Sequence, residues 1–300
     1  MRRRTFLTTT SLAAAGAFVA PSWLDRVLAE GESLRALRGG MHLFSARTGG
    51  TIGVYVAKDA AAVVDTQFPD PAKACLGLLR AKSARKLDAV FLTHHHGDHT
   101  GGVGVFKPEA ARIVAQKNVP ELQKAAAERR GNVADQSYPD TTFEKVYSLD
   151  LGKEVVRAKH FGPAHTGGDA IWAFEQANVV HMGDLVFNGM LPFIDRPGGA
   201  SIQGWMRVLG QALEHYPKDA RYVFGHAADD ADVVGDQEPL KAMVTYLGGL
   251  LDYVKKGKAE GKTVEELSKV ERIPGFESRV AKFDGAIEMN VRAAWEELGS

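Results

Sequence analysis

The stretch THHHGDHTGG, residues 93–102, decides how this chain is interpreted. Six consecutive positions hold five side chains of metal-binding type: His94, His95, His96, Asp98 and His99. Residues two apart in an extended loop point the same way, so His94 and His96 can converge on one ion. Asp98 and His99 can reach a neighbouring ion, whereas His95 should point away. The alternative is a solvated polar loop, but the loop follows a predicted buried strand, where unpaired imidazoles are costly to desolvate.

Three later residues stand in similar positions. His165 lies in the glycine-rich turn GPAHTGGDA, Asp184 follows the predicted strand NVVHM, and His226 follows the apolar run YVF. Functional groups of α/β folds collect where strands end and loops begin. Each of the three alone would more often be structural. Together with the stretch 93–102 they favour a metal site.

This spaced set, HxHxDH with three later partners, resembles the metallo-β-lactamase-fold hydrolase superfamily over roughly residues 41–230. The resemblance implies an α/β fold of the αββα sandwich type, with additional C-terminal helices and the metals at one edge of the paired sheets. It implies two Zn²⁺ ions per chain, with iron or manganese as other possibilities. The first ion would be bound by His94, His96 and His165, and the second by Asp98, His99 and His226, with Asp184 bridging the two.

Such a centre is expected to hydrolyse a small-molecule substrate. Metal ions lower the pKa of bound water to about 7, so a metal-bridging hydroxide can attack a carbonyl near neutral pH. Asp98 is the predicted catalytic residue, which would orient the hydroxide and pass a proton to the leaving group. The chain contains no GxSxG serine motif. We therefore expect hydrolysis of an ester-like, lactone, thioester or lactam bond.

This chain differs from β-lactamases of the superfamily at two positions, and these differences disfavour a β-lactam as the principal substrate. One subclass of metallo-β-lactamases has a cysteine ligand where this chain has Asp184, and another lacks the bridging carboxylate. Phe187 stands where many β-lactamases carry a basic residue that binds the substrate carboxylate. The full ligand set more closely resembles hydroxyacylglutathione hydrolases (glyoxalase-II-like) and lactonases. A β-lactamase proper, a mononuclear iron persulfide dioxygenase and a non-catalytic metal-binding protein remain as alternatives.

Supporting residues have two interpretations each. Asp65 ends a predicted strand and would either cap it or hydrogen-bond a ligand imidazole. Asn188 could bind an oxyanion, although a turn role is favoured. The remaining candidates are expected to pack closely, to form core, or to lie at the surface: Gly101, Gly102, Gly104, Trp172, Trp205, Phe193, Cys75, His42, His160, His181 and His215. Of these, Phe193 and the two tryptophans could instead wall an apolar substrate, and His160 is near enough to line the pocket.

Composition and order of elements agree with a globular hydrolase. The chain has 300 residues, of which 45% are hydrophobic and 25% are charged, which is ordinary for a folded protein. Lysine plus arginine equals aspartate plus glutamate at 37 each, so no nucleic-acid partner is expected. The single cysteine excludes an internal disulfide. We expect a hydrolase domain over residues 30–238 and a helical segment over 239–300 that packs on it, covers the pocket or forms an interface.

The predicted elements alternate along the chain. Strands are expected within 41–66 (three), 88–94, 142–162 (two), 169–174, 178–184 and 221–226, and helices at 71–84, 119–131 and 204–216, with a capping box at Thr263. Between residues 104 and 119 the pattern is weak.

The first residues predict an export signal. MRRRTFLTTTSLAAAGAFVAPSWL has a basic start, an uncharged stretch and small residues, the layout of a signal peptide. Arg3 and Arg4 before Phe6 and Leu7 resemble the twin-arginine pattern. We expect residues 1–29 to engage the twin-arginine export machinery, with cleavage after Ala17 or Ala29 and a periplasmic mature chain without a stable membrane span. Removing residues 1–29 removes four arginines and one aspartate, which leaves a net charge of −3.

Overall fold

The computed structural model describes residues 33–46, 49–229 and 232–299. The predicted export signal, residues 1–29, lies outside the described residues. Seven strands of the described chain form one sheet in sequence order, and six form a second sheet in the order β15-β13-β11-β10-β9-β8. Strands β12 (Phe187–Asn188) and β14 (His226–Ala227) pair separately at the edge that carries the site.

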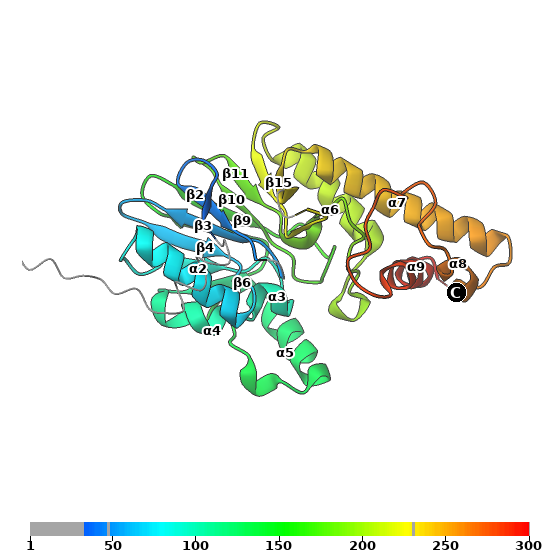
Figure 1. Ribbon diagram of the computed structural model, residues 1–300, viewed down its shortest axis with the longest axis horizontal. Coiled ribbons are helices and arrows are strands. Elements are labelled where there is room, and N and C mark those ends of the chain that lie inside the picture. Colours follow the sequence, from blue (N-terminus) through cyan, green and yellow to red (C-terminus); the bar gives the residue numbers. More distant parts are fainter. Residues whose placement is uncertain (1–32, 47–48, 230–231, 300) are drawn as a thin grey trace, which may run out of the picture.

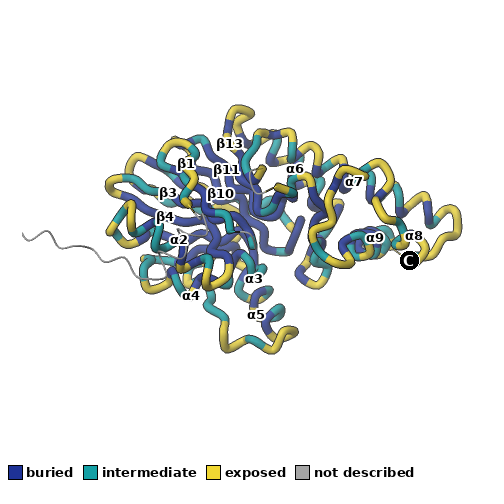
Figure 2. The backbone as a smooth tube through the Cα atoms, viewed as in Figure 1, coloured by how far each residue is buried: buried dark blue, intermediate teal, exposed yellow. Residues whose placement is uncertain are grey.

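The first sheet consists of β1 (Arg35–Ala36), β2 (Met41–Phe44), β3 (Ile52–Val56), β4 (Ala61–Val64), β5 (Ala89–Phe91), β6 (Ile113–Gln116) and β7 (Thr141–Phe143). The second consists of β8 (Val146–Asp150), β9 (Val155–Lys159), β10 (Ile171–Phe174), β11 (Val179–His181), β13 (Arg221–Val223) and β15 (Val234–Gly235). Their inner faces share one apolar core, in which Phe91 stacks on Trp172 with ring centroids 4.4 Å apart. Figure 2 shows this interior as a continuous buried layer.

Helices cover the outer face of each sheet (Figure 1). Helices α2 (Pro69–Lys82) and α4 (Val103–Phe106) pack on the first sheet, where Cys75 is buried as predicted. Helices α6 (Ile202–His215), α7 (Glu238–Ala259) and α9 (Ala286–Glu297) share the core on the other side. The layers are therefore helix, sheet, sheet, helix, as expected, with additional C-terminal helices.

Local chemistry explains several boundaries. Helix α5 (Val119–Arg130) ends at Gly131, whose φ of 70° is readily adopted only by glycine. Helix α6 begins after Ser201, whose side chain accepts a hydrogen bond from the Gly204 amide. Helix α8 (Val264–Ser268) begins with the predicted capping box at Thr263. The predicted strands and helices are all present, and strand β6 is an addition in the stretch where the pattern was weak.

The C-terminal segment, residues 239–299, packs on the same fold. Figure 1 shows α7 running away from the sheets, with α8 and α9 beside it. Among the helices that the structure describes, none is both long enough and apolar enough to cross a membrane.

Candidate metal centre

The sheet topology brings the predicted ligands to one edge. Strands β4 and β5 run parallel in the first sheet, and β11 and β13 run parallel in the second. The carboxyl ends of parallel neighbours meet at the same sheet edge. Residues 93–96 follow β5 and lead into the short helix α3 (Gly97–Thr100), which carries Asp98 and His99. The 3₁₀ turn η3 (Gly183–Leu185) with Asp184 follows β11, and His226 follows β13. His165 comes from the loop between β9 and β10.

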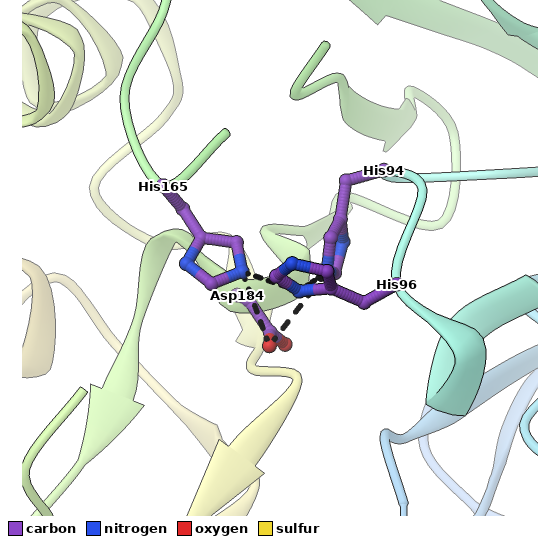
Figure 3. A group of neighbouring side chains, drawn as sticks. All are labelled: His94, His96, His165 and Asp184. Carbon is purple, nitrogen blue, oxygen red and sulfur yellow. Dashed lines mark hydrogen bonds and ion pairs between the residues drawn. The ribbon is translucent and has the colours of Figure 1, made fainter. Parts of the chain in front are cut away.

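Two donor groups form there. The first donor group is His94, His96 and His165. Its ring nitrogens converge: His96 Nδ1 lies 3.0 Å from His94 Nε2 and 3.1 Å from His165 Nε2. Asp184 closes this group, with Oδ2 3.6 Å from His165 Nε2 and 3.8 Å from His94 Nε2. Figure 3 shows these four side chains pointing toward one another, with His94 and His96 on one segment of the chain and His165 and Asp184 on two others.

The second donor group is Asp98, His99 and His226. Asp98 Oδ2 lies 3.0 Å from His226 Nε2 and 3.6 Å from His99 Nε2. Asp184 also reaches this group, with Oδ1 3.0 Å from His99 Nε2 and Oδ2 3.3 Å from His226 Nε2. The structure thus places Asp184 between the two donor groups, the position expected of a bridging ligand. All seven predicted ligands lie in these groups.

Hydrogen bonds on the far side of two imidazoles show which nitrogens are donors. His96 Nε2 lies 2.9 Å from Asp195 Oδ2, so it donates to the carboxylate and leaves a lone pair on Nδ1. Thr93 Oγ1 donates to Asp65 Oδ2 at 2.8 Å, so it accepts from His94 Nδ1, 3.0 Å away, and His94 Nε2 carries a lone pair. Two lone pairs thus face each other across 3.0 Å, an arrangement that a cation between them would stabilise.

Buried atoms in the second donor group fit a cation in the same way. Among the described residues, His99 Nε2 and Asp184 Oδ1 are buried without a hydrogen-bond partner, although they lie 3.0 Å apart. His99 Nδ1 is hydrogen-bonded to Asp65 Oδ2 at 2.8 Å, which turns Nε2 toward Asp184. Nitrogen and carboxylate donors suit zinc, iron and manganese. The residues present therefore fit a pair of divalent ions.

The histidine pKa values shift in opposite directions in the two donor groups. Burial lowers the pKa of His165 to about 3 and holds that of His94 well below its usual value, so both rings are neutral and free to ligate. Burial also disfavours the charged form of His226, but Asp184 and Asp98 outweigh it and raise its pKa to about 9. Without a metal, protons on this group balance the carboxylates, and metal binding would release them.

Glycines allow close packing at Asp184 and in the turn that follows the histidine-rich stretch. A Cβ at Gly225 would stand 1.9 Å from Asp184 Oδ1, and one at Gly102 would stand 2.3 Å from the Thr66 carbonyl oxygen. The close packing predicted for the glycines after the motif is thus confirmed at Gly102, and also at Gly101, where the nearest atom would be 2.6 Å away.

The supporting residues are placed as follows. Asp65 hydrogen-bonds the His99 imidazole, as one of its two interpretations expected, and also accepts from the Thr93 amide, which follows β5 and not the strand that Asp65 ends. Asn188 lies in strand β12 and not in the turn that was favoured, and its side chain donates to the Asp232 carbonyl. His95 turns away from both donor groups, with Nε2 3.4 Å from Asp195 Oδ2.

Most of the other side chains with two interpretations form core. Trp172 and Trp205 are fully buried and donate to the Leu92 and Leu185 carbonyls. His181 is buried and hydrogen-bonded at both ring nitrogens. Phe193 is only partly buried and lies edge-on to His96, with ring centroids 5.4 Å apart. Phe193 is therefore the one of the three aromatic candidates that can wall the site.

Sequence reasoning missed two carboxylates beside the site. Asp195 accepts from His96, and Asp169 accepts from the amide and hydroxyl of Thr166 in the turn that carries His165. Burial raises the pKa of Asp169 to about 7, against the hydrogen bonds from Thr166. The stretch GPAHTGGDA predicted the turn but not the role of Asp169, which directly follows the glycine pair and could have been singled out for that reason.

Comparison with known proteins gives one family. The family model described as "Metallo-beta-lactamase superfamily" matches residues 46–230, which include both donor groups. A hydroxyacylglutathione hydrolase from Gloeothece citriformis (strain PCC 7424) is 30% identical over 138 residues, 44% of this chain and 47% of that protein. An uncharacterized protein from Aquifex aeolicus (strain VF5) is 26% identical over 190 residues, 61% of this chain and 86% of that protein. The chain thus spans about half the length of the hydroxyacylglutathione hydrolase.

Solved structures show the same fold. A metallo-β-lactamase from Pontibacter korlensis superposes with a TM-score of 0.61 at 18% identity, over 72% of this chain and 99% of that one. A double mutant of the sec-alkyl sulfatase PisA1 superposes with a TM-score of 0.68 at 16% identity, over 92% of this chain and 52% of that one. At these identities the likeness concerns the fold alone.

Proposed function

Because the chain belongs to the metallo-β-lactamase superfamily, we propose that it is an exported binuclear zinc hydrolase acting on an ester-like, lactone, thioester or lactam carbonyl. The observation that carries this proposal is the pair of adjoining donor groups with Asp184 between them. The hydroxyacylglutathione hydrolase relative adds support for a thioester or related substrate.

The exposed fractions of the seven candidate ligands indicate which of them face the substrate. Divalent ions bound here would supply an activated water and a Lewis acid for the carbonyl. Asp98 has the most exposed side chain of the seven candidate ligands, at 25%, followed by His226 at 20%. The substrate therefore approaches from the side of Asp98 and His226. Asp98 uses Oδ2 toward His226, which leaves its second oxygen to take a proton from the attacking water and pass it to the leaving group.

The proposal is tested by metal content and turnover together. Purified mature chain is expected to hold two zinc ions and to hydrolyse at least one member of a panel of lactones, thioesters and esters. One iron per chain with persulfide oxidation would favour the dioxygenase instead. Metal binding without turnover of any compound by the wild-type chain would favour a non-catalytic binding protein.

We expect only weak β-lactamase activity. Phe187 is buried and stacks on His226 with ring centroids 5.4 Å apart, at the position where many β-lactamases place a cation. A chromogenic cephalosporin should therefore be hydrolysed with kcat/KM below about 10⁴ M⁻¹s⁻¹, the low end of ordinary enzymes. Steady-state kinetics of the zinc-loaded chain check this. A higher value that depends on zinc and on Asp98 would identify a β-lactamase proper.

Export by the twin-arginine route is part of the proposal. In a cell-fractionation experiment, the full chain should reach the periplasm and be shortened after Ala17 or Ala29, which the intact mass of the mature chain reports. The double substitution Arg3→Lys and Arg4→Lys should retain the chain in the cytoplasm. A periplasmic chain in the lysine variant would refute this route, and substitution of Arg26 alone serves as the control.

A further inference from the structure

The loop between β12 and α6, residues 189–201, connects the first donor group to the C-terminal segment. Its Asp195 side chain is 11% exposed and lies directly behind His96, with Oδ2 2.9 Å from His96 Nε2 and 3.4 Å from His95 Nε2. The second carboxylate oxygen, Oδ1, accepts from the Gly198 amide at 3.0 Å. Both oxygens are therefore held, and the carboxylate has a defined orientation toward His96.

We propose that Asp195 is a positioning residue for His96 and that the C-terminal segment keeps it in place. This inference rests on the proposed function, because it assigns Asp195 to the same metal centre. By accepting a hydrogen bond from the His96 Nε2–H group, Asp195 selects the tautomer whose Nδ1 lone pair faces His94 and His165. A carboxylate in this position also increases the basicity of the ligand nitrogen.

The start of the loop is anchored by the C-terminal segment. Val280 exchanges backbone hydrogen bonds with Gly189 and Leu191, at 3.0 and 2.9 Å. Arg279 is 9% exposed and donates to the Met190 carbonyl at 2.8 Å and to the Phe187 carbonyl at 3.2 Å. These bonds hold the strand end that carries Phe187, which stacks on His226.

The middle and end of the loop are anchored by α9. Asn290 donates to the Pro192 carbonyl at 2.8 Å. Glu297 forms an ion pair with Arg196, the residue after Asp195, and accepts from the Ser201 hydroxyl at 2.9 Å. Arg196 also donates to the Ala200 carbonyl at 2.6 Å, which closes the turn around Asp195. The C-terminal segment thus fixes both ends of the loop that supports His96, through Arg279 and Val280 at the start and through α9 further along.

The positioning role of Asp195 is tested by the affinity of the metal-free chain for zinc. This affinity is measured by competition with a chromophoric chelator. Loss of an outer partner of a ligand typically weakens metal binding by about 10–100-fold. Asp195→Ala should weaken one of the two sites by that factor and leave the other unchanged, and Asp195→Asn should weaken it less, because the amide oxygen still accepts a hydrogen bond. Glu297→Gln should weaken the same site to a smaller extent.

Matched controls separate positioning from folding. Asp252→Asn is exposed on α7, and Glu288→Gln replaces an exposed ion-pair partner of Arg292 on α9 itself, so neither should change zinc affinity. The visible spectrum of the cobalt(II)-loaded chain should change in Asp195→Ala but not in the controls. Thermal unfolding of the metal-free variants shows whether they fold.

The outcomes are distinct. Wild-type zinc affinity and an unchanged cobalt spectrum in both Asp195 variants would overturn the inference, as would a weakening matched by an equal loss of stability in the metal-free chain. A wild-type chain that binds no metal at all would instead overturn the proposed function. A folded Asp195→Asn variant with one weakened site supports the positioning role.

Discussion

Asp184→Ala is expected to cause the largest loss of any single substitution, removing metal binding and activity together. The Asp184 carboxylate is buried and lies 3.0–3.8 Å from four imidazoles of the two donor groups. Removing it deletes a donor from both groups, so zinc affinity should fall by more than the about 10–100-fold that loss of an outer partner costs.

The loss of zinc affinity in Asp184→Ala should also reduce the stabilisation of the folded chain by zinc. Ligand binding to the folded chain stabilises it by about 4.1 kcal/mol at a free concentration of about 1,000 Kd. Thermal unfolding with and without zinc should therefore show a metal-dependent rise in Tm for the wild type, and a much smaller rise for Asp184→Ala. Asp252→Asn is the control, and an undiminished rise in Asp184→Ala would contradict the assigned position of this residue.

Asp98→Asn is expected to lower kcat by about 10²–10⁴-fold, the range for loss of a general acid–base, while zinc remains bound at saturating concentration. The asparagine keeps an oxygen toward His226 Nε2, which lies 3.0 Å from Asp98 Oδ2 in the wild type. It cannot accept and return a proton as a carboxylate does. Steady-state kinetics on the best substrate of the panel, with zinc content measured in parallel, check this.

The zinc content and activity of Asp98→Asn together distinguish a ligand role of Asp98 from a catalytic role. If Asp98→Asn loses zinc in proportion to its activity, Asp98 acts chiefly as a ligand and another group transfers the proton. If the activity of Asp98→Asn equals that of the wild type, the assignment of Asp98 as the catalytic residue is wrong. His95→Ala is unsuitable as a control, because His95 lies within 3.4 Å of Asp195.

Local patterns were sufficient for most of the fold. The β-rich runs in residues 41–66 and the turn residues between them predicted β2, β3 and β4, and the glycine at position 131 predicted the end of α5. Strand β6 was missed because it is four residues long, and short apolar runs do not distinguish a strand from a buried helical segment. The sandwich itself was predicted from the family resemblance and is confirmed by the two sheets and their helical layers.

Residues 93–99 carry four of the seven predicted ligands close together, and Asp184 and His226 follow shortly after strands β11 and β13. Asp65 could be singled out for the same reason, since it ends β4 beside the loop. These are consequences of spacing and of strand alternation, both of which are local properties of the chain. The full set and its division between two ions came from the family resemblance.

The residue that hydrogen-bonds the ligand imidazole of His96, and the residues that hold the loop 189–201, could be identified only from the tertiary structure. Asp195 lies 99 positions after His96 in the chain, and Glu297 lies 101 positions after Arg196. No periodicity links such residues, because their contacts arise only when the loop 189–201 packs between the site and the C-terminal helices. The sequence by itself therefore determined which side chains gather in the two donor groups, while the packing of distant segments decided that Asp195 lies beside His96 and where the C-terminal helices lie.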